Sequence, residues 1–152
     1  MLMNREWIAA RIPHQGRMCL LDEVLDFDVR GIRCRTGTHR LIDNPLRAHG
    51  RLGIACGIEY AAQAMALHGA LAPGMPAQNG GAARAGLLAS VRGVRPLALR
   101  LDDIESDLTC EARHVAGDSA TALYEFELRA GERILLSGRA SVVLDAAGKF
   151  EL

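Results

Sequence analysis

Residues 55–72 read ACGIEYAAQAMALHGALA, a stretch so apolar that it is expected to form one buried helix. Glu59 stands one turn into this segment. A carboxylate in apolar surroundings costs free energy unless it is paired or used, because desolvation disfavours its charge. Gln63 follows four positions later, so the two side chains leave the same face of the helix one turn apart. We therefore expect the functional site on this helix.

The composition describes one ordinary globular domain covering residues 1–152. The chain is 49% hydrophobic and 24% charged, which is enough apolar material for a core of its own. Its 18 basic and 18 acidic residues leave no net charge that would draw it to nucleic acid or membranes. The first residues carry charges and no apolar run, and polar residues interrupt 55–72, so neither a signal peptide nor a membrane span is expected.

The four cysteines indicate a reducing, cytoplasmic setting and no metal site. They are scattered, without a CxxC pair or a histidine at a metal-ligand spacing: Cys19, Cys34, Cys56 and Cys110. We expect them to be small core residues with free thiols.

The elements around the helix are expected to be strands. Asn4 suits the N-cap of a short helix that ends before Pro13, and the turn-rich residues 38–54 lead into the long helix. Residues 72–85 contain Pro73, Gly74 and Gly80 and read as a flexible connection. Alternating or apolar runs predict strands at 18–29, 32–37, 86–95, 105–115, 119–129 and 132–144.

One long apolar helix between a strand pair and a meander predicts an α+β fold, with an antiparallel sheet wrapped around the helix. In the strand at 119–129, the even-numbered residues from Ala120 to Leu128 are apolar and the other face is mostly polar. A single sheet of this size leaves open edges, so a homodimer or a higher homo-oligomer is expected.

Several segments resemble the hot-dog-fold 3-hydroxyacyl-acyl-carrier-protein dehydratase family. Residues 12–14 (IPH) and 18–25 (MCLLDEVL) are similar to its PH…LLD.VL motif, and 59–63 (EYAAQ) to its EAMAQ helix motif. Residues 86–94 (GLLASVRGV) stand where the family has its first strand after the helix. The order of motifs is similar over most of the chain, and the resemblance is greater still to the divergent dehydratase-like branch of aryl-polyene and polyketide-type lipid pathways.

The resemblance implies removal of water from a 3-hydroxyacyl thioester to give a 2-enoyl thioester, in fatty-acid or polyketide-like lipid synthesis. A histidine suits the base that takes the C2 proton, since its unperturbed pKa is about 6.5. Glu59, if desolvated, would hold the proton that the departing hydroxyl takes, and Gln63 would orient Glu59 or a water. The backbone N–H groups of Cys56 and Gly57 in the first helical turn are candidate donors to the thioester oxygen.

The identity of the base is open among three histidines. Most of the family carries its catalytic histidine in a GHFPG loop ahead of the helix, whereas residues 46–53 here read LRAHGRLG. His49 is the best positional match, although it stands only ten residues before Glu59. His14 and His39 are its rivals, and each of the three also has a purely structural interpretation.

The family resemblance also predicts the partners. No bound cofactor is expected, because the substrate arrives on the 4′-phosphopantetheine of acyl carrier protein or on coenzyme A. Arg92 and Arg95 belong to a local excess of arginines, with Arg84 and Arg100, that would meet an acidic carrier or its phosphate.

Two alternative functions compete with the dehydratase. An acyl thioesterase on the same fold would use Glu59 to activate water or to polarise the thioester. A non-catalytic subunit would instead complete a heterodimer with an active hot-dog partner, an idea motivated by the altered histidine loop. Fold alone does not separate these functions.

Overall fold

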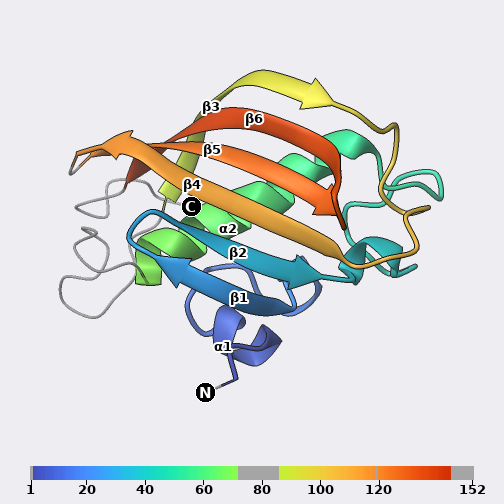
Figure 1. Ribbon diagram of the computed structural model, residues 1–152. Coiled ribbons are helices and arrows are strands. Elements are labelled where there is room, and N and C mark those ends of the chain that lie inside the picture. Colours follow the sequence, from blue (N-terminus) through green and yellow to red (C-terminus); the bar gives the residue numbers. More distant parts are fainter. Residues whose placement is uncertain (1, 72–85, 119, 145–152) are drawn as a thin grey trace.

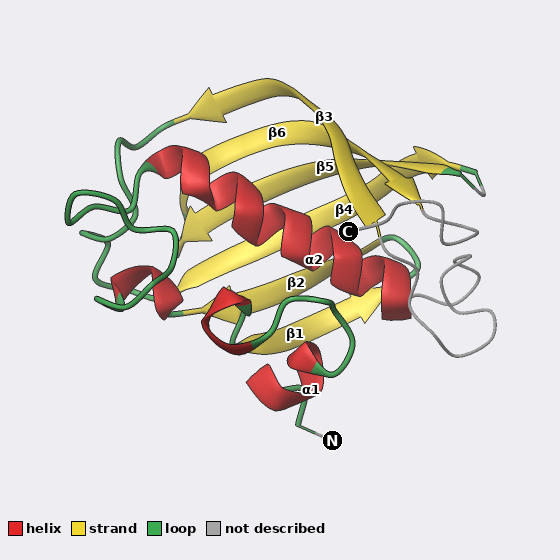
Figure 2. Cartoon of the chain, turned by 180° about the vertical axis from the view of Figure 1, so that it is seen from behind, coloured by secondary structure: helices red, strands yellow, loops and turns green. Residues whose placement is uncertain are grey.

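The computed structural model describes residues 2–71, 86–118 and 120–144, which form one antiparallel sheet wrapped around one long helix (Figures 1 and 2). The first half of the chain also contains three short 3₁₀ turns, at Gly16–Met18, Thr38–Arg40 and Ile54–Cys56. The helices and strands in chain order are α1 (Arg5–Ala9), β1 (Glu23–Asp28), β2 (Gly31–Thr36), α2 (Gly57–Leu71), β3 (Gly86–Pro96), β4 (Leu108–Gly117), β5 (Thr121–Ala130) and β6 (Arg133–Leu144).

The sheet has the strand order β1-β2-β4-β5-β6-β3, and every neighbouring pair is antiparallel. β4, β5 and β6 form the predicted meander, whereas β3 lies at the edge beyond β6. α2 runs across one face of the sheet, in front of the strands in Figure 2, and Figure 1 shows the other face, which no described helix covers. The predicted α+β architecture is confirmed.

The two faces of β5 differ as the sequence predicts. The side chains of Tyr124, Phe126 and Leu128 are buried beneath α2, and the residues between them are partly exposed on the outer face. Burial of such large side chains stabilises the fold by about 1.5–3 kcal/mol each relative to exposure. The alternation therefore fixes which face of the sheet meets α2.

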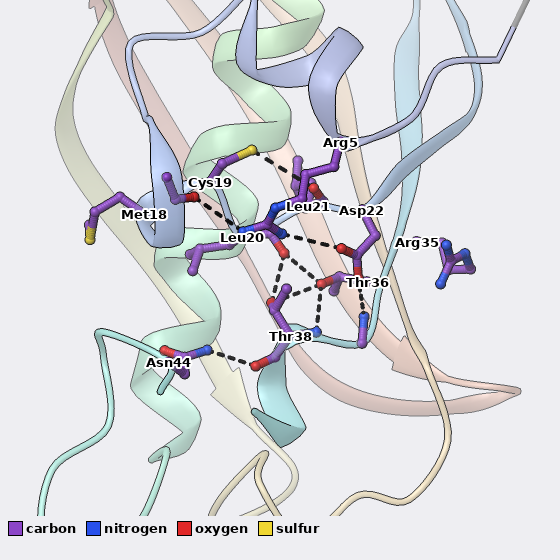
Figure 3. A network of polar contacts seen from close by, with 12 residues as sticks. Arg5, Met18, Cys19, Leu20, Leu21, Asp22, Arg35, Thr36, Thr38 and Asn44 are labelled. Atoms are coloured by element: carbon purple, nitrogen blue, oxygen red, sulfur yellow. Dashed lines mark hydrogen bonds and ion pairs between the residues drawn. The ribbon is translucent and has the colours of Figure 1, made fainter. Parts of the chain in front are cut away.

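The segment 18–22 is not the strand that the sequence predicts. A 3₁₀ turn ends at Met18, the next three residues are buried, and β1 begins only at Glu23. The backbone of Leu20 bonds to side chains instead of a neighbouring strand. Its N–H donates to Gln63 Oε1 at 2.9 Å, and its carbonyl accepts from the hydroxyls of Thr36 and Thr38 at 2.6 and 2.7 Å. Distant side chains thus replace a sheet ladder (Figure 3).

Both helices begin for identifiable reasons. Asn4 is the N-cap of α1, as predicted, and its Oδ1 accepts from the N–H of Trp7 at 3.1 Å. α2 begins at Gly57 rather than at residue 55, because Ile54–Cys56 form a tighter 3₁₀ turn. The predicted connection at 72–85 lies outside the described residues. No helix in the described parts of the chain is long and apolar enough to cross a membrane.

The far end of α2 is held by a buried histidine. His68 Nε2 lies 2.8 Å from the carbonyl oxygen of Asp28, and Nδ1 lies 2.8 Å from the Tyr124 hydroxyl. A carbonyl only accepts, so Nε2 carries the hydrogen and Nδ1 accepts from Tyr124. Burial lowers the pKa of His68, and the neighbouring His114 lowers it further, while the hydrogen bond to Asp28 raises it. The folded chain therefore keeps this imidazole neutral.

This neutral imidazole predicts a pH-dependent stability. The unfolded chain protonates His68 near its ordinary pKa of about 6.5, whereas the folded chain does so only at lower pH. The free energy of unfolding therefore falls as the pH drops through about 6.5. We expect His68→Gln to reduce this decrease in the free energy of unfolding, as measured by urea unfolding at about pH 7.5 and about pH 5.5. The exposed His49→Gln is the control, and an equal pH dependence in all three proteins would contradict the assignment.

Candidate functional site

The first turn of α2 presses directly against the sheet. Gly57 is buried, and a Cβ added there would lie 2.7 Å from Leu136 Cδ2 and 3.0 Å from Leu128 Cδ2. Any larger residue would force these two leucines of β5 and β6 to move. The glycine thus allows the close packing of the helix on the sheet.

Glu59 is exposed in the single chain, contrary to the expectation that it is desolvated. Its neighbours Tyr60 and Ala61 are buried against the rest of the protein, whereas Glu59 leaves α2 on a side that no described element covers. The apolar character of the helix did not predict the exposure of Glu59, because the fold of the single chain leaves part of the helix surface uncovered. A carboxylate here is available to a ligand or a partner.

His14 lies beside Glu59. Its ring is half-buried, and Nδ1 is enclosed and makes no hydrogen bond to any described residue. Burial lowers the pKa of His14, and the negative charge of Glu59 raises it. Because burial is the larger effect, the imidazole is neutral at pH 7 and has a free lone pair for a proton. The structure thus brings together two of the predicted catalytic residues, His14 and Glu59.

Gln63 bonds to backbone and not to Glu59. Its Oε1 accepts from the N–H of Leu20 at 2.9 Å, and its Nε2 donates to the carbonyl of Met18 at 2.5 Å. The side chain is only 1% exposed. Both ends of the amide are therefore occupied by the segment that follows His14, rather than by Glu59 or a water.

The N–H groups predicted to receive the thioester oxygen are already bonded. The N–H of Cys56 donates to the carbonyl of Gly53 at 3.0 Å, and that of Gly57 to the carbonyl of Ile54. The 3₁₀ turn before α2 is the reason, since it satisfies donors that an abrupt helix start would leave free. Burial and the charge of Glu59 both raise the pKa of the Cys56 thiol, which excludes a ready thiolate nucleophile.

His49 does not join the site. It is exposed at the tip of a turn closed by Ala48 and Arg51, whose backbones bond reciprocally at 2.9 and 3.0 Å. His49 and Gly50 both have positive φ, 53° and 74°. Such a turn favours glycine or a polar residue at each centre, so the His-Gly pair is explained by the turn.

His39 is a buried structural residue. It is fully enclosed, and its Nε2 donates to the carbonyl of Ile104 at 2.9 Å. Burial lowers the pKa of His39, and no described contact joins it to Glu59. His14 is the candidate base whose pKa is influenced by the charge of Glu59.

The arginines divide into paired and exposed members. Arg100 pairs with Asp102, and Arg84 lies outside the described residues. Arg92 and Arg95 are exposed on β3, and neither forms an ion pair with another described residue. Arg92 stands directly opposite Arg139 of β6 in the ladder. Like charges in this position repel each other, and a bound anion would weaken that repulsion.

The grooves described on the single chain do not border Glu59. A groove of about 610 Å³ lies instead on the outer face of the sheet, lined by residues of β3 to β6. Much of its wall consists of ion pairs such as Arg113 with Glu125 and Arg129 with Glu127. Neither His14 nor Glu59 lines it. The described residues also hold no cluster of three groups suited to a metal ion.

The proximity of His14 and Glu59 is directly measurable. Glu59→Gln removes the charge that raises the pKa of His14, so the His14 pKa should fall further below its ordinary value. An NMR titration of the imidazole protons would follow it, with His49 as an internal reference. An unchanged His14 titration would show that the two groups do not interact.

Comparisons with known proteins were made for the whole chain. A family model described as ApeP-like, ApeP dehydratase, matches residues 7–150. No curated protein sequence matches. A solved structure of the dehydratase heterocomplex ApeI:P from Xenorhabdus doucetiae is 21% identical, with a TM-score of 0.76 and 90% of each chain covered.

More distant structures share the fold. A thioesterase from Haemophilus influenzae is 13% identical, with a TM-score of 0.57 and coverage of 85% of this chain and 82% of that one. A hypothetical thioesterase from Streptococcus pneumoniae, solved with coenzyme A, is 12% identical, with a TM-score of 0.56 and coverage of 80% and 84%. The architecture is the predicted hot-dog fold. Because the family model spans nearly the entire sequence, the chain belongs to the ApeP-like dehydratase family.

Proposed function

We propose that the chain removes water from a 3-hydroxyacyl thioester, with His14 as base and Glu59 as acid. The observation that carries this proposal is a neutral, half-buried imidazole beside a carboxyl group on the first turn of α2. Membership in a dehydratase family supports the reaction class. The substrate and the roles of the residues are our inference.

The two groups suffice for the proton transfers of the reaction. His14 takes the C2 proton, and the electron pair of that C–H bond forms the C2–C3 double bond as the C3–O bond breaks. Glu59, protonated once a second subunit excludes water from it, gives its proton to the departing hydroxyl, which leaves as water. The products are a 2-enoyl thioester, water, a protonated imidazole and a carboxylate, and proton exchange with solvent restores the starting state.

A second subunit is needed to complete this site. Glu59 is exposed, whereas a carboxyl group that delivers a proton works best where water is excluded. β3 offers the surface, since its outer edge pairs with no described strand and Val94 is 37% exposed. Two leucines that follow β3 are more exposed to solvent, Leu97 at 52% and Leu99 at 90%.

This edge leads directly to the site. The carbonyl of Leu99 accepts from the N–H of Ile54 at 3.1 Å, in the turn that begins α2. A subunit that covers Leu97 and Leu99 therefore also reaches Glu59. We propose a hot-dog partner here, either a second copy of this chain or a different subunit, as in the ApeI:P heterocomplex.

The exposed arginines of β3 suit the carrier of the substrate. Arg95 pairs in the ladder with Ser137, and the next residue pairs with Leu136, which touches the first turn of α2. Arg95 thus lies at the end of β3 nearest Glu59. We propose that Arg92 and Arg95 attract the phosphate of 4′-phosphopantetheine, on acyl carrier protein or coenzyme A.

Substitution of the two groups tests the reaction. We expect His14→Gln and Glu59→Gln each to lower turnover of a 3-hydroxyacyl-N-acetylcysteamine thioester by about 10²- to 10⁴-fold. His49→Gln should remain close to the unchanged protein. Ultraviolet absorbance of the conjugated enoyl thioester follows the reaction, with the chain alone and with added hot-dog partner.

The same reaction mixtures distinguish the competing functions. A thiol reagent detects free thiol if the chain is a thioesterase, and a dehydratase releases none. Loss of activity in His49→Gln but not in His14→Gln would overturn the assignment of the base. Full activity of the partner without this chain would favour the non-catalytic role.

The proposed subunit surface has its own test. Leu97→Glu combined with Leu99→Glu places charge on the apolar stretch after β3 and should weaken association, as measured by sedimentation velocity. Turnover should fall in parallel and recover at higher protein concentration. Val29→Glu is the matched control, because Val29 is 55% exposed and follows β1 at the opposite edge of the sheet. Unchanged association of the double variant would place the interface elsewhere.

A further inference from the structure

The segment that carries His14 crosses α2 and is bonded to it through one side chain. Among the described residues, the two bonds of Gln63 are the only hydrogen bonds between α2 and residues 13–22. The amide bonds Met18 at one end and Leu20 at the other, and Met18 ends the 3₁₀ turn that begins two residues after His14. Gln63 therefore holds the strap, as we call residues 13–22, against the helix of Glu59.

The carbonyl side of Leu20 is fixed by a second set of bonds. Thr36 and Thr38 both donate to the Leu20 carbonyl, so the Thr38 hydroxyl has no hydrogen left for Tyr60. The Tyr60 hydroxyl, 2.8 Å away, therefore donates to Thr38 and accepts from Asn44 Nδ2 at 3.0 Å. This network ties the strap to β2 and the following loop, and through Thr38 and Tyr60 it also reaches the first turn of α2 indirectly.

The far end of the strap is also anchored away from α2. The Asp22 carboxylate accepts from the N–H of Gly37 at 2.7 Å and from Arg5 at 3.2 Å (Figure 3). Gln15 Nε2 donates to the carbonyls of Ala9 and Ile12 near the other end. These bonds give the strap its shape, and among the described residues only Gln63 bonds the strap directly to the helix.

We propose that Gln63 is a positioning residue that sets the separation between His14 and Glu59 by clamping the strap to α2. The inference rests on the proposed roles of those two residues, and it assigns Gln63 no contact with substrate. An amide is required because one end of the side chain must donate a hydrogen bond and the other end must accept one. The Gln63 side chain is only 1% exposed to solvent. Loss of the bond to Leu20 leaves a buried backbone N–H unpaired, which favours a displaced strap.

A readout that needs no activity tests the clamp. In the unchanged protein, Glu59→Gln should lower the pKa of His14, and the size of that change reports how close the groups lie. We expect the same substitution to have a much smaller effect in a Gln63→Met background, where the strap is released. An equal effect in both backgrounds would overturn the inference, whatever reaction the protein catalyses.

Turnover gives a second readout, in which the kind of loss matters. Misplacement of a catalytic group by about 1 Å costs on the order of 10²-fold, so we expect Gln63→Met to lower kcat by about 10- to 10²-fold. KM should change little, because Gln63 does not touch the substrate. A Gln63→Met effect confined to KM would contradict a positioning role.

Gln63→Glu tests the donor separately. Its carboxylate still accepts from Leu20 but donates to Met18 only when protonated, so its kcat relative to the unchanged protein should rise as the pH falls. Tyr124→Phe is the matched control, because it removes a buried hydrogen bond at the far end of α2. If Tyr124→Phe, at equal loss of thermal stability, lowers kcat as much as Gln63→Met does, the effect is general destabilisation and the clamp is excluded.

Discussion

The packing of the first turn of α2 on the sheet is the constraint from which the site follows. Gly57 lies where a side chain would meet Leu128 and Leu136, so the helix cannot rise or roll without losing that contact. With the helix fixed, Glu59 and Gln63 leave it on the same face. The strap covers the turn of Gln63 but not that of Glu59, so one polar residue is buried and fully bonded while its neighbour is exposed.

The electrostatics of the pair depend on two opposed effects on one imidazole. Burial lowers the pKa of His14, and the nearby carboxylate of Glu59 raises it. A base that must be unprotonated at neutral pH benefits from the first effect, and its protonated form gains from the second once it has taken a proton. Acid–base catalysis commonly uses two groups whose surroundings push their proton affinities apart. Here the single chain supplies the burial of His14, and the cover over Glu59 must come from outside it.

Local patterns predicted the fold well, and the site only in part. The alternation in β5 and the Asn4 cap need only neighbouring residues, and both were read correctly. The segment 18–22 was misread because its backbone is satisfied by Gln63, Thr36 and Thr38, up to 45 positions away. The exposure of Glu59 was missed for a similar reason, since apolar composition does not say which face of a helix the same chain covers. One available signal was overlooked: His49 precedes Gly50, a pair that suits a tight turn better than a catalytic loop.

The position of the base on the strap has a consequence for assembly. A histidine on the loop before α2 would take its place from the turn at Ala48–Arg51, which in the described residues is tied to α2 through the chain itself, the bond from Cys56 to Leu46 and the bond from Asn44 to Tyr60. A histidine on the strap is instead held relative to α2 by the two hydrogen bonds of Gln63. The same helix carries Glu59, the proposed acid. The separation of base and acid then belongs to one subunit, and a partner has only to exclude water and complete the pocket. In the proposed arrangement, such a chain can accept either a copy of itself or a different hot-dog subunit without rebuilding the proposed catalytic pair.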